Sequence, residues 1–160
     1  MPGSVFNRRV DAPVHFQDKA GGFVLDGKLE SVRLFVPDAG ERELVLVVWF
    51  DYWMFRRIDR AHLFGYTFES IEREGLTQWE LTSALPVQLE LRAEGAARDA
   101  LAGLAGDALL EQAAAALTGA DTTSPLVDAA NYRYLAVYQE KRSGDATYLA
   151  GFTSVYRKQG

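Results

Sequence analysis

The feature that most constrains the fold is the stretch of residues 94–117, in which Ala, Leu, Glu and Asp replace the β-branched and aromatic residues found on either side. Strong helix formers without a β-branched residue predict a helix. Gly103 and Gly106 weaken its centre, because a glycine costs about 0.5–1 kcal/mol relative to alanine inside a helix. One long helix and two helices broken near Gly106, with Asp107 capping the second, both fit this pattern. Gly119 is the expected C-terminal stop.

Short runs rich in Val, Phe, Tyr and Trp precede this stretch and predict β-strands. Asp26-Gly27 lies between two such runs, residues 22–25 and 28–36, and an Asp-Gly pair in this position is typical of a type I′ hairpin turn. Residues 37–40 have the composition of a second turn, and the longest strand is expected over residues 43–55. Further strands are expected at residues 5–10, 63–73 and 77–84, and from Pro86 onward.

The strand that begins at Pro86 has a regular alternation of apolar and polar residues. Between residues 87 and 92, odd-numbered positions are apolar and are expected to face the core, whereas even-numbered positions are polar and are expected to face solvent. After the helix and a loop at residues 120–130, two more strands are expected at residues 132–141 and 146–157. A turn at residues 142–145 joins them into a hairpin.

These segments together predict an α+β protein that is mostly β. We expect a curved antiparallel sheet of about eight to ten strands, a sandwich or partial barrel, with one long or broken Ala-rich helix before a C-terminal β-hairpin. The chain has 160 residues, the length of one ordinary domain. We therefore expect residues 1–160 to form a single globular domain whose core needs neither disulfides nor a structural metal.

Several classes of protein are excluded by what the chain lacks. Its longest apolar run, residues 44–50, is far shorter than the roughly 18 residues that suggest a membrane span. It has no cysteine, which excludes disulfides and thiol chemistry and fits a reducing compartment. Its two histidines, His15 and His62, show no metal-binding spacing. We expect a cytoplasmic protein without a membrane span, a metal or another cofactor.

Asp51 is the most unusual position in the strand expected at residues 43–55. Side chains alternate across a sheet, so Asp51 shares a face with Trp49 and Trp53, and both faces of this strand are otherwise apolar. A carboxylate in apolar surroundings must be paired, protonated or close to water. Asp51 is therefore a candidate general acid or base, or the polar anchor of a bound ligand. The alternative is an ion pair with one of the arginines that follow, Arg56, Arg57 and Arg60.

An aromatic pocket between the sheet and the helix would collect side chains from several of these strands. Its expected lining is Trp49, Asp51, Trp53, Tyr66 and Trp79, which suits a small apolar or aromatic ligand. If such a pocket holds an enzyme, the candidate catalytic residues are Asp51, Glu69 and His62. Carboxylates are common on the wet face of a sheet, so Glu69 equally fits an ordinary surface position.

Arg56, Arg57 and Arg60 form a basic cluster that is a candidate anion-binding site. The whole chain, however, has 17 basic and 22 acidic residues and a formal net charge of −5. Nucleic-acid-binding domains usually carry a basic stripe that dominates their surface. The charge balance therefore argues against a nucleic-acid partner, and a solvated loop of locally paired charges is the alternative.

The expected C-terminal hairpin is rich in aromatic residues. Simple alternation puts three tyrosines on one face of its first strand and three aromatic residues on one face of its second. These candidate interaction residues are Tyr132, Tyr134, Tyr138, Tyr148, Phe152 and Tyr156. Tyrosine is enriched at protein interfaces because it offers a rigid apolar body with a polar tip. Ordinary cross-strand packing is the alternative.

The functional hypothesis favoured by these residues is a non-enzymatic module for protein interaction or self-association that uses an aromatic-rich sheet face. Its partner would be another protein or a second copy of the chain. The alternative is a small-molecule-binding domain with an aromatic pocket between sheet and helix, which includes an enzyme that works without a metal. The interaction module is placed first because the sequence has many aromatic residues and no recognisable set of catalytic groups.

Overall fold

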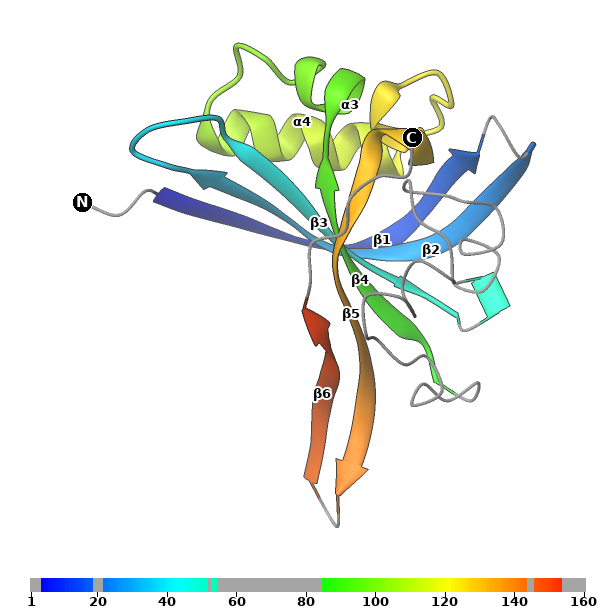
Figure 1. The fold of residues 1–160 in the computed structure, drawn as a ribbon. Helices are drawn as coiled ribbons and strands as arrows, with labels where there is room; N and C mark the ends of the chain where they lie inside the picture. The colour runs from blue at the N-terminus through cyan, green and yellow to red at the C-terminus, as the bar shows by residue number, and fades with distance from the viewer. Residues whose placement is uncertain (1–3, 19–21, 52, 55–84, 144–145, 154–160) are drawn as a thin grey trace.

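The computed structural model describes residues 4–18, 22–51, 53–54, 85–143 and 146–153, and the statements below concern these residues. They contain one open sheet in which each strand pairs antiparallel with its neighbour in sequence (Figure 1). The strands are β1 (Ser4–Asp18), β2 (Phe23–Val36), β3 (Glu43–Phe50), β4 (Val87–Ala93), β5 (Tyr132–Ser143) and β6 (Ala146–Thr153).

Helices α3 (Gly95–Asp99) and α4 (Gly106–Thr118) connect β4 to β5, followed by two short 3-10 helices, η3 (Pro125–Val127) and η4 (Ala129–Asn131). The predicted fold class, α+β and mostly β with a helix before a C-terminal hairpin, is confirmed. Two of the predicted strands, at residues 63–73 and 77–84, lie outside the described residues.

Helix α4 lies across one face of the sheet, against β1 and β2 (Figure 1). Its buried residues recur at helical spacing and form one apolar face. They are Leu109, Leu110, Ala113, Ala114 and Leu117. Burial of each leucine side chain contributes roughly 1.5–3 kcal/mol to stability. This face therefore fixes the position of the helix on the sheet.

The Ala-rich stretch is two helices, which is one of the two predicted alternatives. Gly103, with a φ of +85°, lies between α3 and α4, and α4 begins at Gly106. Ala105 is the N-cap residue of α4, so the prediction that Asp107 would cap this helix is wrong. Asp107 lies in the first turn instead, where its carboxylate interacts favourably with the N-terminal end of the helix dipole. Gly119 is the C-cap residue, as predicted.

The predicted hairpin turn at Asp26-Gly27 is wrong. Both residues lie inside β2, with Gly27 opposite Val14 of β1, and neither has the positive φ that a type I′ turn requires. The connection between β1 and β2 instead falls between Asp18 and Phe23. An Asp-Gly pair does not always mark a turn, because a glycine inside a strand can also allow another part of the chain to approach closely.

Gly27 is needed for the close approach of β3. A Cβ atom at this position would lie 2.8 Å from the Cε1 atom of Phe50 and 2.8 Å from the carbonyl oxygen of Trp49. Both distances are shorter than van der Waals contact, so any larger residue must displace the Phe50 ring or the β3 backbone. Phe50 in turn packs against Phe16 of β1, with ring centroids 6.2 Å apart. Gly27 thus helps to join the first three strands.

The outer strands differ from the predictions in length and regularity. β1 extends well beyond the predicted residues 5–10, because a bulge between Arg9 and Ala12, with Asp11 at a φ of +51°, lets the strand continue. β3 ends at Phe50 instead of residue 55. The turn at residues 37–40 is confirmed, as is the C-terminal hairpin. In β4 the predicted alternation holds except at Gln88, which is buried instead of facing solvent.

We expect Gly27→Ala to lower the free energy of unfolding by about 1–3 kcal/mol, because the new Cβ overlaps the Phe50 ring and the Trp49 carbonyl. Urea unfolding followed by tryptophan fluorescence measures this change. Val24→Ala, at an exposed position of the same strand, is the control and should change the free energy by less than about 0.5 kcal/mol. If Gly27→Ala is as stable as the parent protein, the close approach of β3 does not constrain this position.

Candidate functional site

The structure brings Trp49 and Asp51 together at the end of β3, but not in a closed aromatic pocket. Both residues line a shallow hollow of about 430 Å³, together with Lys28 and Glu140. The indole nitrogen of Trp49 donates to Glu30 Oε1 at 3.1 Å, so it already has a partner on β2.

Asp51 and Trp53 lie beyond the end of the strand and are exposed. Asp51 Oδ1 accepts a hydrogen bond of 2.7 Å from the backbone N–H of Met54, which is a local capping contact. The apolar surroundings expected for this carboxylate are therefore not found. Trp53 is 67% exposed. The other residues of the predicted pocket, catalytic site and anion site lie outside the described part of the chain: Tyr66, Trp79, Glu69, His62, Arg56, Arg57 and Arg60.

Tyr132, a predicted interaction residue, is completely buried. Its ring meets Phe16 edge-on, with ring centroids 5.6 Å apart, and its hydroxyl donates to the carbonyl oxygen of Leu126 at 2.5 Å. Burial raises the pKa of the Tyr132 phenol far above its ordinary value. Tyr132 therefore belongs to the protein core and does not present a surface to a partner.

The predicted grouping of Tyr132, Tyr134 and Tyr138 on one face is wrong. Tyr134 lies opposite Leu91, which is buried in the core, whereas Tyr138 lies opposite Gln88 of the other face. A bulge in β5 between these two positions adds one residue and reverses the alternation. In β6, Tyr148 and Phe152 lie opposite Lys141 and Val137, and Tyr156 lies outside the described residues.

We expect Tyr132→Phe to lower the free energy of unfolding by about 1 kcal/mol, because the buried Leu126 carbonyl loses its hydroxyl donor. Chemical unfolding measures the loss. The oligomeric mass, measured by light scattering, should stay the same, because the residue is in the core. A change in oligomeric mass with unchanged stability would instead place Tyr132 in an interface.

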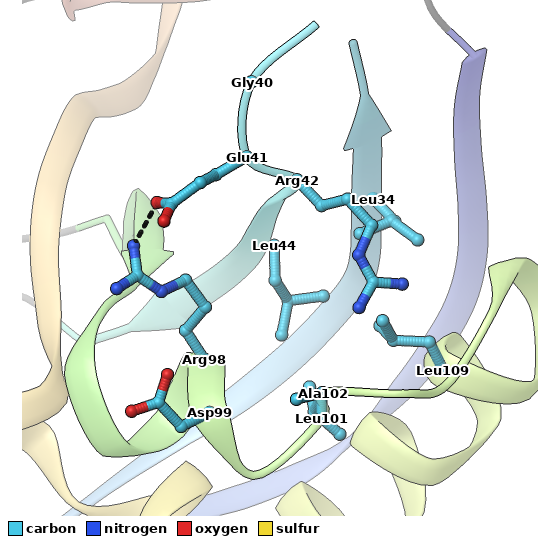
Figure 2. A pocket seen from close by; sticks show the side chains of 10 residues that line it. All are labelled: Leu34, Gly40, Glu41, Arg42, Leu44, Arg98, Asp99, Leu101, Ala102 and Leu109. Carbon is cyan, nitrogen blue, oxygen red and sulfur yellow. Dashed lines mark hydrogen bonds and ion pairs between the residues drawn. The ribbon is translucent and has the colours of Figure 1, made fainter. Parts of the chain in front are cut away.

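A groove opens between the β2–β3 turn and the two helices (Figure 2). Its volume is about 340 Å³. Four leucines that are almost completely buried form its floor: Leu34 of β2, Leu44 of β3, Leu101 after α3, and Leu109 of α4. Packing of α4 on the sheet brings these side chains together from four separate segments. The bottom of the groove is therefore apolar.

An ion pair spans one side of the groove (Figure 2). Arg98 Nη1 of α3 donates to Glu41 Oε2 of the β2–β3 turn at 2.6 Å. Both side chains are substantially exposed, so the pair is screened by water and contributes little to stability. Glu41 neutralises Arg98, and Asp99 adds a second carboxylate to the lining of the groove (Figure 2).

Arg42 differs from the other charged residues of the groove. Its Nη1 donates to the carbonyl oxygen of Leu104 in the segment between the helices, so the side chain reaches across from the turn to the helical side. It is partly buried, and no carboxylate of the described residues lies within ion-pair distance of it. In Figure 2 its guanidinium group lies between Leu34 and Leu109. Among the described residues, Arg42 therefore places a positive charge without an ion-pair partner beside the leucines of the floor (Figure 2).

An adjoining charged hollow of about 310 Å³ shares Arg42 with the groove, but its remaining arginines are paired. Arg92 donates to Glu43 at 3.1 Å and to Glu94 at 3.2 Å, and Arg133 donates to Glu94 at 3.1 Å. These ion pairs link the start of β3 to β4 and β5. The charges of this network compensate one another, which makes Arg42 the distinctive cation of the region.

Sequence analysis did not identify the groove or Arg42. The turn at residues 37–40 was recognised only as a turn, and the four floor leucines look like ordinary core residues of their strands and helix. The available signal was the charged pair Glu41 and Arg42 directly after that turn. Their proximity to Arg98 and Leu104 depends on tertiary packing, which residue spacing does not contain.

Comparison of the chain with protein-family models, with curated protein sequences and with solved structures finds no match. Within the described residues, no three His, Cys, Asp or Glu side chains are grouped closely enough to hold a metal ion. None of the described helices has the length and apolar character needed to cross a membrane. The groove is therefore interpreted from its own geometry and charge.

Proposed function

We propose that this protein binds a small molecule, and that its groove takes an elongated apolar ligand carrying one anionic group. The apolar part lies on the leucine floor, and the anionic group meets Arg42. The observation that carries the proposal is the position of Arg42: it is partly buried beside apolar side chains, with no carboxylate partner among the described residues.

The size and lining of the groove support a ligand of this kind. Pockets for small molecules are typically about 300–1,000 Å³, and this groove has about 340 Å³ with an apolar bottom and charged residues around it. Each methylene group removed from water contributes about 0.8 kcal/mol. A short alkyl chain on the floor therefore supplies most of the affinity, while Arg42 sets the orientation.

The chemistry of the guanidinium group favours a carboxylate as the anionic group. An arginine has several N–H donors in a planar fork that matches the two oxygens of a carboxylate. The bond to Leu104 engages Nη1 and holds the fork in place, while donors remain for a ligand. Hydrogen bonds between ions are about twice as strong as those between neutral groups. A neutral ligand of the same length should therefore bind less tightly.

This proposal develops the small-molecule alternative of the sequence analysis, with a different site. The predicted pocket was aromatic and centred on Trp49 and Asp51, whereas the groove proposed here is lined by leucines and centred on Arg42. The hollow beside Trp49 has one cation, Lys28, beside two carboxylates, Asp51 and Glu140. Its net negative charge is less favourable for an anion than the lining of the groove, which has two arginines and two carboxylates.

Octanoate is a suitable probe, with 1-octanol as its neutral counterpart. We expect Arg42→Gln to weaken octanoate binding about tenfold or more, as loss of a charged hydrogen bond does, and to leave binding of 1-octanol unchanged. Isothermal titration calorimetry measures both affinities. Arg33→Gln is the matched control, because this arginine lies next to Leu34 on the opposite face of β2.

Two results of this experiment would contradict the proposal. One is equal octanoate affinity in Arg42→Gln and the parent protein. The other is binding of 1-octanol as tight as that of octanoate. A loss of octanoate binding in Arg33→Gln as large as in Arg42→Gln would show a general charge effect, which also contradicts a site at Arg42.

Removal of the Glu41 charge should strengthen octanoate binding by about two- to tenfold, because Arg98 then adds its charge to the rim. The gain should shrink at high salt, because the rim is exposed to solvent. Titration of Glu41→Gln at low and high ionic strength measures this effect. Glu111→Gln, on the exposed side of α4, is the control. Unchanged or weaker binding by Glu41→Gln would show that Glu41 does not limit the charge of the groove.

A further inference from the structure

The sheet has two edges, β1 and β6, and they differ in how well they are protected. Within the described residues, no strand pairs with the outer side of either one. An edge strand exposes a row of backbone N–H and C=O groups that can pair with a strand of another molecule. Natural proteins block this pairing with bulges, prolines and charged residues on the edge.

β1 carries all three of these protective features. Its register breaks between Arg9 and Ala12, where Asp11 has a φ of +51°. Pro13 follows directly and lacks a backbone donor. Arg9 and Asp11 also form an ion pair of 2.7 Å on this strand. An incoming strand therefore cannot continue regular pairing along β1.

β6 carries none of these features. Its eight residues include no charge and no proline, and its pairing with β5 is regular from Ala146 to Thr153. β5 pairs with β4 only as far as Gln139, so β6 is the only described strand that pairs with residues 140–143. The tip of the hairpin consequently projects beyond the sheet, on the side away from the helices (Figure 1). Within the part of the chain that the structure describes, the outer side of β6 is therefore unpaired.

We propose that β6 pairs antiparallel with β6 of a second copy of the chain, which joins two sheets across a two-fold axis. A strand without charge can face itself without repulsion between like charges. The other way to join two copies, β6 of one against β1 of the next, is opposed by the bulge and Pro13. Pairing of like edges closes after two copies, whereas pairing of unlike edges leads to open chains. The second copy is therefore the partner that fits this edge.

The proposal is tested by measuring the oligomeric mass of the parent protein and of a variant with one charge introduced into β6. Size-exclusion chromatography with light scattering should give the full chain a mass of twice 17.7 kDa. Leu149→Lys introduces a charge near the centre of β6, where the two copies of the new lysine would lie close to the two-fold axis. We expect it to raise the dimer dissociation constant by about tenfold or more.

Leu149 is a suitable position because Glu140 lies opposite it on β5, so a lysine there gains a favourable neighbour within its own chain. The urea unfolding midpoint is measured at a protein concentration below the dissociation constant of the dimer, so that both proteins are monomers. Under these conditions the midpoint of Leu149→Lys should stay close to that of the parent protein. Val5→Lys is the matched control: Val5 is exposed on the opposite edge, so the dimer should persist.

A parent protein that stays monomeric up to high micromolar concentration would overturn the proposal. A dimer that tolerates Leu149→Lys, or one that is lost with Val5→Lys, would overturn it as well, because the interface would then lie elsewhere. Amide hydrogen exchange gives an independent readout: residues 146–153 should exchange more slowly in the dimer than in the Leu149→Lys monomer.

Discussion

The packing of the apolar face of α4 against β1 and β2 is the contact on which the rest of the structure depends. It buries all three leucines of the helix and fixes where the segment between α3 and α4 passes the β2–β3 turn. Only this placement brings the Leu104 carbonyl within reach of Arg42 and closes the leucine floor of the groove. A shift of the helix along the sheet would separate the groove from its cation.

The fold was predictable where the residues act locally. The absence of β-branched residues from residues 94–117 indicated the helices, and the glycines indicated the break between them. The errors arose where a distant contact overrides a local preference. Asp26-Gly27 resembles a turn, but Gly27 serves the approach of Phe50 from another strand. The bulge in β5 is likewise set by pairing with β4, so the faces of Tyr132 and Tyr138 could not be read from simple alternation.

The candidate site was less predictable than the fold, for the same reason. The residues that stand out in the sequence include Asp51, which is an exposed capping residue, and Tyr132, which is a core residue. The groove is built from leucines, small residues and four charged residues that are individually ordinary. What distinguishes Arg42 is that the neighbouring arginines have carboxylate partners, and this follows from their positions in space.

In the proposed function, the leucine floor and Arg42 act together as one binding site. Nuclear magnetic resonance tests it most directly, with labelled leucine methyl groups and the arginine Nε resonances observed during titration with octanoate. We expect the methyl resonances of Leu34, Leu44, Leu101 and Leu109 to shift along one saturation curve with the Nε resonance of Arg42. Shifts of the Trp49 indole resonance alone, or floor leucines that shift without Arg42, would contradict it.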